Sequence, residues 1–130
     1  MIQGKVWGKT EALLVTPMIE VHKITVNAGG YCSMHKHEFK WNMFYVLYGE
    51  LDIHVRKNEY DLVDVTNLRV GEHTSVAPNE YHMFKHHVPP DEEEMVKKWG
   101  RPAAAAALEI YYLESISKDI IRETVGGITN

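Results

Sequence analysis

The chain has 130 residues, of which 45% are hydrophobic and 25% are charged, and this is the composition of an ordinary globular protein. Its net charge of −4 argues against nucleic-acid binding, because contacts to phosphate need clustered Lys and Arg side chains. A chain of this length and composition predicts one domain, over residues 1–130. No apolar run approaches the roughly 20 residues of a membrane span and there is no signal-peptide pattern, so we expect a protein of the cytoplasm and not of a membrane.

Short segments that are apolar or alternate between apolar and polar recur at intervals of roughly ten residues, which is the spacing of an all-β sandwich or barrel. Turn residues such as Gly49 and Gly71 separate them. In "LDIHVR", Leu51, Ile53 and Val55 share one face, as expected of a half-buried strand. We expect antiparallel strands at 11–16, 19–26, 43–49, 51–57, 60–65, 73–77, 81–86 and from about Ala106 to 116.

Residues 88–109 break this pattern. Pro89 and Pro90 are followed by Asp91 and a run of Glu, and basic residues precede Gly100. Acidic residues in the first turn and basic residues in the last turn complement the dipole of a helix. We therefore expect a short helix in an insertion before the last strand.

Cys32 is the single cysteine of the chain. One cysteine cannot form an intramolecular disulfide, so the sequence fits a reducing compartment. Cys32 could be a reactive thiol, but we favour a plain buried or turn residue.

The segment "HKH" at 35–37 raises the question of a metal site. Two histidines two residues apart on a strand present both imidazoles on the same face, and converging imidazoles are what a metal site needs. Solvated or core histidines are the alternative interpretation. The spacing around this pair is regular: five residues separate Gly29 from His35, four separate His37 from Asn42, and six separate Asn42 from Gly49.

A second regular spacing lies downstream. Five residues separate Gly71 from Ala77-Pro78-Asn79, two separate Asn79 from His82, and three separate His82 from His86. Together, the two spacings resemble the two motifs of the cupin superfamily. Asn42 stands where that family usually has glutamate, and Ala77, Asn79 and His86 replace its usual Pro, Gly and Asn.

The cupin resemblance implies an antiparallel jelly-roll β-barrel with a metal inside, held by His35, His37 and His82. Asn42 would be an optional fourth ligand. Without the glutamate the ligand set is neutral, and three imidazoles suit Zn, Fe, Ni, Mn or Cu. We therefore expect one divalent transition metal.

A narrower resemblance rests on "KVWGKTEALLV", "HKITVNAGGYCSMHKH" and "ISKDIIRET". These segments look like the cupin domain of type II mannose-6-phosphate isomerases and mannose-1-phosphate guanylyltransferases. The resemblance implies a carbohydrate-like ligand and isomerisation, in which a metal polarises oxygens and a base moves a proton. The base would be His86, Glu80 or Glu114, and Arg122 could neutralise a phosphate.

Two alternatives follow from Asn42. Cupins that lack the glutamate resemble three-histidine iron dioxygenases, and a non-catalytic ligand-binding or regulatory cupin would need no base at all. In each case Phe44, Val46 and Tyr48, in phase with Asn42, would wall the pocket. Because small cupins usually pair through a sheet face, we also expect a homodimer through the strands "EALLV" and "IYYLE".

Overall fold

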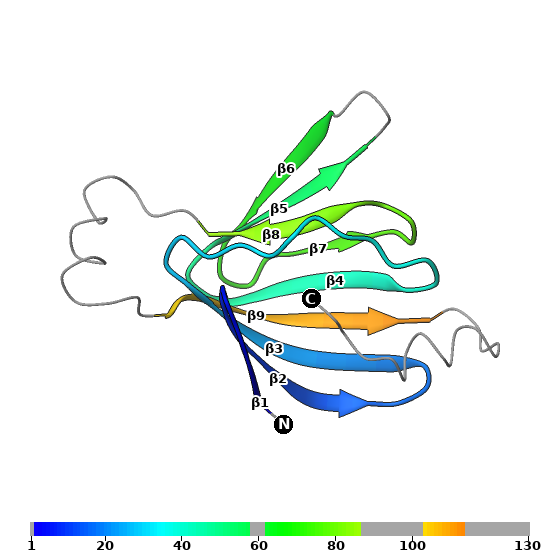
Figure 1. Cartoon of the computed structure of the whole chain (residues 1–130), viewed down its shortest axis with the longest axis horizontal. Helices are drawn as coiled ribbons and strands as arrows, with labels where there is room; N and C mark the ends of the chain where they lie inside the picture. The colour runs from blue at the N-terminus through cyan, green and yellow to red at the C-terminus, as the bar shows by residue number, and fades with distance from the viewer. Residues whose placement is uncertain (1, 58–61, 87–102, 114–130) are drawn as a thin grey trace.

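The structure is a computed structural model, and it describes residues 2–57, 62–86 and 103–113. Within these ranges the regular structure consists of strands, and all of their pairings are antiparallel (Figure 1). No helix in these ranges is long and apolar enough to cross a membrane. The predicted all-β antiparallel fold is confirmed. The strands are β1 (Ile2–Lys5), β2 (Gly8–Val15), β3 (Ile19–Asn27), β4 (Trp41–Tyr48), β5 (Leu51–Arg56), β6 (Val63–Leu68), β7 (His73–Val76), β8 (His82–Lys85) and β9 (Ala103–Tyr112).

Two sheets face each other across the core. The larger sheet has six strands in the order β1-β2-β3-β9-β4-β7, and the smaller has three in the order β6-β5-β8. Figure 1 shows β9 lying between β3 and β4, although these strands are far apart in the sequence. Both sheets contribute to one hydrophobic cluster, in which Ile24, Val26, Phe44 and Val46 of the larger sheet meet residues such as Leu51, Ile53, Leu68 and Phe84 of the smaller one.

The interior of the barrel is apolar at one end and polar at the other. On β3 the inward-facing residues change from Glu20 and His22 to Ile24 and Val26 along the strand, and all four are buried. The neighbouring strand β9 changes in the same direction, from Tyr111 and Glu109 to Ala107 and Ala105. The apolar end supplies packing, and the polar end holds the site described below.

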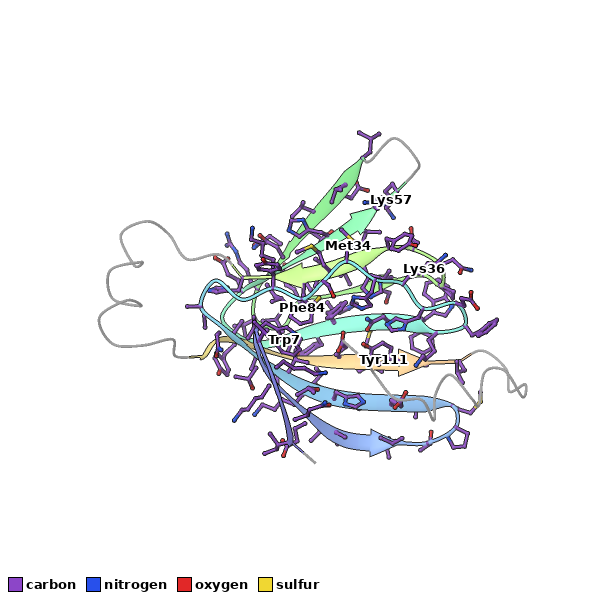
Figure 2. The ribbon with its side chains drawn as sticks, in the orientation of Figure 1. Trp7, Met34, Lys36, Lys57, Phe84 and Tyr111 are labelled. Atoms are coloured by element: carbon purple, nitrogen blue, oxygen red, sulfur yellow. The ribbon has the colours of Figure 1, made fainter. Side chains whose placement is uncertain are left out.

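Packing at the apolar end is centred on aromatic contacts. The rings of Trp7 and Phe84 meet edge to face with centroids 4.7 Å apart, and Figure 2 shows both at the core between the sheets. Burying a side chain of this size contributes about 1.5–3 kcal/mol. Leu51 and Ile53 of β5 are fully buried and Val55 packs on the same cluster, as the alternation in "LDIHVR" predicted.

Each of the eight predicted strands has a counterpart, with shifted bounds. β1 was not predicted, and β9 begins at Ala103 instead of about Ala106. The alanines form a strand because they pair with β3 on one side and with β4 on the other. The turn at Gly49 lies directly against them, and a Cβ on Gly49 would collide with the Ala104 carbonyl oxygen. The high helix propensity of alanine is thus overruled by tertiary packing. Most of the expected helical segment, residues 87–102, lies outside the described residues.

The prediction that Tyr48 faces inward with Phe44 and Val46 is wrong. Tyr48 is 44% exposed, whereas Phe44 and Val46 are fully buried. The pairing of β4 with β9 shifts register between Val46 and Tyr48. Such a bulge inserts an extra residue and reverses the alternation of inward and outward side chains beyond it.

Candidate metal centre

Residues 28–40 form an extended strap between β3 and β4 that runs beside β8 (Figure 1). The backbone of His35 exchanges two hydrogen bonds with that of His82, at 3.0 and 2.8 Å. The amide of His86 donates to the Gly30 carbonyl, and the amide of Asn79 donates to the His37 carbonyl. The prediction that "HKH" lies on a strand of the sheet is therefore wrong in detail, because His35 makes only an isolated bridge to His82. That bridge still brings the two cupin-like spacings together.

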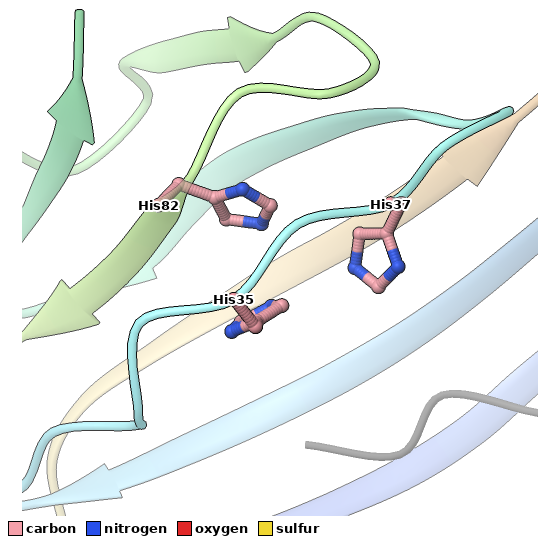
Figure 3. Close-up of side chains that lie close together, drawn as sticks. All are labelled: His35, His37 and His82. Atoms are coloured by element: carbon pink, nitrogen blue, oxygen red, sulfur yellow. The ribbon is translucent and has the colours of Figure 1, made fainter. Parts of the chain in front are cut away.

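Three imidazole rings converge at this point. Figure 3 shows His35 and His37 reaching from the strap toward His82 on β8. One ring nitrogen from each residue lies within 4.8 Å of the others, and the ring centroids are 4.4 to 5.5 Å apart. Ligands on one ion with metal–nitrogen bonds of about 2.1 Å lie roughly 3–4 Å apart. Small ring movements would therefore complete a three-histidine site.

Backbone carbonyls set the tautomers of two of the histidines. His35 Nδ1 lies 2.7 Å from the Ser33 carbonyl oxygen, and His82 Nδ1 lies 2.9 Å from the Glu80 carbonyl oxygen. A carbonyl only accepts, so both Nδ1 atoms donate and both Nε2 atoms carry the lone pair. His35 Nε2 is buried with no hydrogen-bond partner among the described residues. This is the arrangement that orients metal-binding histidines in proteins.

The cluster also favours neutral imidazoles. Burial lowers the pKa of His37 to about 3, with further lowering from His35, His82 and Lys40. Burial lowers the pKa of His82 to about 4, and it lowers that of His35 as well. Because a metal binds the neutral ring, the three side chains are in the ligand state at neutral pH. The donor set fits a divalent transition metal.

Solved structures of cupins superpose on most of this chain. KdgF from Halomonas sp. is 11% identical, with a TM-score of 0.66 over 88% of this chain and 89% of that one. The cupin domain of Cnp3 from Schizosaccharomyces pombe is 12% identical, with a TM-score of 0.65 over 100% of this chain and 77% of that one. An RmlC-like cupin from Shewanella frigidimarina is 18% identical, with a TM-score of 0.61 over 92% and 86%. The chain has the cupin fold.

The cupin resemblance read from the two motifs is therefore confirmed at the level of fold. At the level of sequence, no family profile and no curated protein matches the chain. The narrower resemblance to type II mannose-6-phosphate isomerases is not confirmed by these structures and stays a prediction.

Asn42, which the motif resemblance aligns with the usual cupin glutamate, lies on β4 and is 1% exposed. Its Nδ2 lies 3.1 Å from His82 Nε2 and 3.3 Å from Glu109 Oε2, so the amide donates toward both. Its Oδ1 is buried with no hydrogen-bond partner among the described residues. In this orientation the amide contacts the histidine lone pair instead of offering an oxygen to a metal. Service as a fourth ligand would need the amide to turn over, and it stays a prediction.

Glu109 is a site residue that sequence reasoning missed. It lies on β9, is 3% exposed and accepts the hydrogen bond from Asn42. Burial raises its pKa, and the Asn42 hydrogen bond partly opposes that rise. The sequence held a signal, since Glu109 and Tyr111 alternate inward, but only the pairing of β9 with β4 shows that they reach the histidines.

The predicted base His86 lies in a different setting. Its Nδ1 donates to the Glu50 carbonyl at 2.6 Å, and the ring lines a small cavity with Asp52, Asn67 and Lys85. None of these residues belongs to the three-histidine cluster. The orientation of His86 into the site is not supported by this geometry, and its catalytic role stays a prediction.

The predicted carboxylate base Glu80 stabilises a turn. Its Oε2 lies 3.1 Å from Lys57 Nζ, and its Oε1 accepts from the Ala77 amide at 3.0 Å. The part of Glu80 that serves the histidines is its backbone carbonyl, through His82. Arg122 and Glu114, the other predicted catalytic residues, lie outside the described residues.

Cys32 is a buried packing residue, as expected. Its sulfur accepts a hydrogen bond from the Phe84 amide, and burial raises its pKa to about 12. Thiol reactivity requires the thiolate, so Cys32 is inert at neutral pH.

Proposed function

We propose that this cupin binds one divalent transition metal ion on His35, His37 and His82 and uses it to bind or transform a small polar molecule of carbohydrate type. The observation that carries the proposal is the convergence of three buried imidazole nitrogens within 4.8 Å, with two tautomers set by backbone carbonyls. A metal bound there supplies a Lewis acid that polarises a carbonyl or hydroxyl oxygen of the ligand.

The residues of the chain would divide the remaining work. The Ser33 and Glu80 carbonyls hold His35 and His82 in the orientation that presents Nε2. Asn42 donates into the site and is itself held by Glu109. If the reaction is an aldose–ketose isomerisation, His86, Glu80 or Glu114 would have to move the proton, and Arg122 would bind a phosphate.

A second candidate function is iron-dependent oxygenation. It is favoured by the neutral ligand set, because the described cluster contains three histidines and no carboxylate. A third candidate, a non-catalytic ligand-binding or regulatory cupin, is supported by the amide at position 42 and by the turn-stabilising contacts of Glu80. Metal content separates the three. Zn or Mn with sugar-phosphate turnover supports the first, Fe with oxygen uptake the second, and no stoichiometric metal the third.

The metal site is tested by titrating metal-free protein with Co²⁺ and following its visible absorption, alongside elemental analysis of protein purified without added metal. The wild type should take up one equivalent, and His35→Ala should lose this uptake. His73→Ala is the matched control, since His73 is an exposed histidine on β7. A wild type that binds no metal under any loading condition refutes the assignment.

We also propose that the protein forms a homodimer through the outer face of the larger sheet. Leu13, Leu14 and Val15 at the end of β2 are 53%, 48% and 57% exposed, and such a run of apolar side chains suits an interface. Light scattering tests the proposal, and a monomer at all concentrations would refute it.

A further inference from the structure

The polar end of the barrel continues beyond the histidines. On the larger sheet Glu20 of β3, Tyr111 of β9 and Asn42 of β4 occupy one cross-strand row, because Tyr111 pairs with both of the others. The next row on the same face holds His22, Glu109 and Phe44. Five of these six side chains are polar or carry a hydroxyl, although all are buried.

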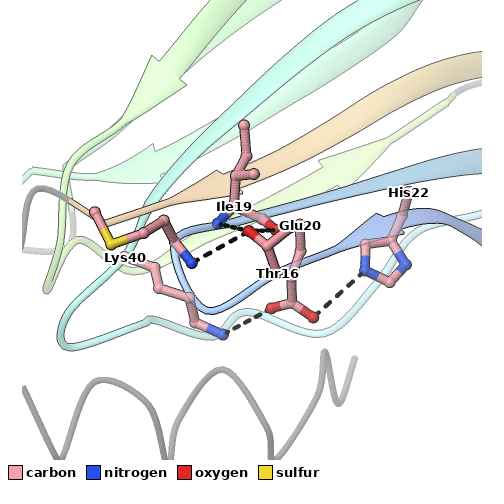
Figure 4. A network of polar contacts seen from close by, with 6 residues as sticks. Thr16, Ile19, Glu20, His22 and Lys40 are labelled. Atoms are coloured by element: carbon pink, nitrogen blue, oxygen red, sulfur yellow. Dashed lines mark hydrogen bonds and ion pairs between the residues drawn. The ribbon is translucent and has the colours of Figure 1, made fainter. Parts of the chain in front are cut away.

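Glu20 and His22 also belong to a network of buried polar and charged groups that includes Lys40 (Figure 4). Lys40 Nζ lies 3.7 Å from Glu20 Oε2, and His22 Nε2 lies 3.8 Å from Glu20 Oε1. Glu20 and Lys40 are each 2% exposed. These distances are too long for good hydrogen bonds. The charges of Glu20 and Lys40 therefore balance, while hydrogen-bonding capacity remains free on these groups.

Tyr111 connects this network to the histidines. Its ring lies edge-on to His37 with centroids 4.9 Å apart, and edge-on to His22 with centroids 6.3 Å apart. Lys40 Nζ lies over the same ring, 5.2 Å from its centroid. Tyr111 therefore contacts both groups and links them into one continuous polar surface inside the barrel.

Several polar atoms of this surface have no hydrogen-bond partner among the described residues. They are Glu20 Oε2, His22 Nε2 and Asn42 Oδ1, and each is buried. The Tyr111 hydroxyl is also buried and interacts with the Glu109 carboxyl group. Buried polar groups in folded proteins are nearly always hydrogen-bonded, so several unsatisfied atoms on one surface indicate a missing partner. Their number and their approach to the histidines point to a ligand with several polar groups.

The chemistry of the surface limits what that ligand is. Glu20 and Lys40 cancel in charge and offer an acceptor and a donor, and the imidazole of His22 offers both functions. The hydroxyl of Tyr111, which faces the Glu109 carboxyl group, keeps an oxygen that can accept a further hydrogen bond. A hydroxyl group donates and accepts, so neighbouring hydroxyls of a sugar match this alternation. A phosphate or carboxylate would face the Glu20 carboxylate with no unpaired cation to balance it among the residues of this surface.

We propose that Glu20, His22, Lys40 and Tyr111 form a subsite that binds the hydroxyl groups of an uncharged carbohydrate, beside the three-histidine centre. This inference rests on the proposed function, since it places the rest of the same ligand. It narrows the carbohydrate to one without a phosphate or carboxylate at this position.

The test is an NMR titration of protein labelled with ¹³C in its tyrosine rings, performed both metal-free and zinc-loaded. The probes are the neutral sugars D-mannose, D-glucose, D-galactose and D-mannitol, with D-mannonate and D-mannose 6-phosphate as charged counterparts. The variants are Tyr111→Phe, which removes only a hydroxyl, and His22→Gln. Tyr112→Phe is the matched control, because Tyr112 is the next residue of β9 and stacks on Trp41.

At least one neutral sugar should shift the Tyr111 signals of the wild type. Measured by calorimetry, because Tyr111→Phe has lost the labelled ring, Tyr111→Phe and His22→Gln should each weaken its binding about tenfold, the effect of one ordinary hydrogen bond, and Tyr112→Phe should leave it unchanged. Binding of none of the neutral sugars, binding of only the charged probes, or equal affinity in Tyr111→Phe would each overturn the subsite. Cobalt titration of the same proteins reports on the histidines separately: lost cobalt binding in the wild type refutes the metal centre, whereas the sugar titrations judge the subsite.

Discussion

The buried ion pair between Lys40 and Glu20 gives the sharpest test of the polar barrel interior. The charges lie 3.7 Å apart and both side chains are at most 3% exposed. At an effective dielectric constant near 20, their attraction is about 4.5 kcal/mol. In Lys40→Met the Glu20 carboxylate would remain buried without its cation. We expect the free energy of unfolding to fall by about 3–5 kcal/mol, as for other broken buried pairs.

The double variant Lys40→Met/Glu20→Leu should recover most of this loss. Replacing both members of a buried pair by apolar groups of similar volume is often neutral or stabilising by about 1–4 kcal/mol. Urea denaturation of the two single variants and the double variant gives the coupling energy. Lys36→Met is the control on the same strap, because Lys36 is exposed and lies over the Tyr81 ring. A Lys40→Met variant within about 1 kcal/mol of wild type, the range of surface pairs, would show that the pair is not buried as described.

Three further predictions follow from backbone geometry, protonation and ligand chemistry. Gly49→Ala should lower the free energy of unfolding, measured by urea denaturation, by more than about 2 kcal/mol, because its Cβ would collide with the Ala104 carbonyl oxygen. Gly71→Ala is the control, since Gly71 has a similar φ and no atom within 4 Å of its Cβ position, and it should cost only about 1 kcal/mol. Equal costs would contradict the close approach at Gly49. In protein from which a chelator has removed any metal, burial lowers the pKa of His37 from 6.5 in the unfolded state to about 3 in the folded state. The unfolded state therefore takes up the proton first, and stability is lost as the pH falls below 6.5. The stability of wild type relative to His37→Gln should therefore drop by up to roughly 1.4 kcal/mol per pH unit between pH 6.5 and about 3, and a constant difference would show that the imidazole is not desolvated. Asn42→Asp, which restores a carboxylate beside His82, should tighten Mn²⁺ binding by about tenfold or more in calorimetric titration, because hard cations prefer oxygen anions, and unchanged affinity would place residue 42 outside the metal shell.

The three-histidine cluster could be predicted from sequence because two spacings along the chain resemble the cupin motifs, and that resemblance implied the three ligands. The second spacing runs from Gly71 through the turn at Asn79 to His82, the first residue of β8. In the structure β8 lies beside the strap, and the backbones of His35 and His82 exchange two hydrogen bonds. Asn79 adopts a φ of 68°, the left-handed conformation that asparagine tolerates better than most residues. The motif resemblance was therefore sufficient to predict these three residues.

The remaining site residues depend on register between strands that are distant in sequence. Glu20, Tyr111 and Asn42 form one row only because β9 pairs with both β3 and β4. Nothing in a single strand specifies that pairing, and a shift of one residue would move every side chain to the other face. Tyr48 shows the same limit, since the bulge that turns it outward is a property of two paired strands.

The position of Glu109 explains how this cupin fold can have Asn42 at the motif position of the usual glutamate and still hold a carboxyl group at its centre. The glutamate position on β4 is Asn42, and the carboxyl group lies on the neighbouring strand, one hydrogen bond away from Asn42 Nδ2. The carboxyl group is thereby separated from the histidines by an amide that contacts His82. A metal on the three imidazoles would then keep a neutral ligand set while a buried acid remains close. Since burial raises the pKa of Glu109, that acid is shifted toward its protonated form, which fits a site whose other groups also favour uncharged states.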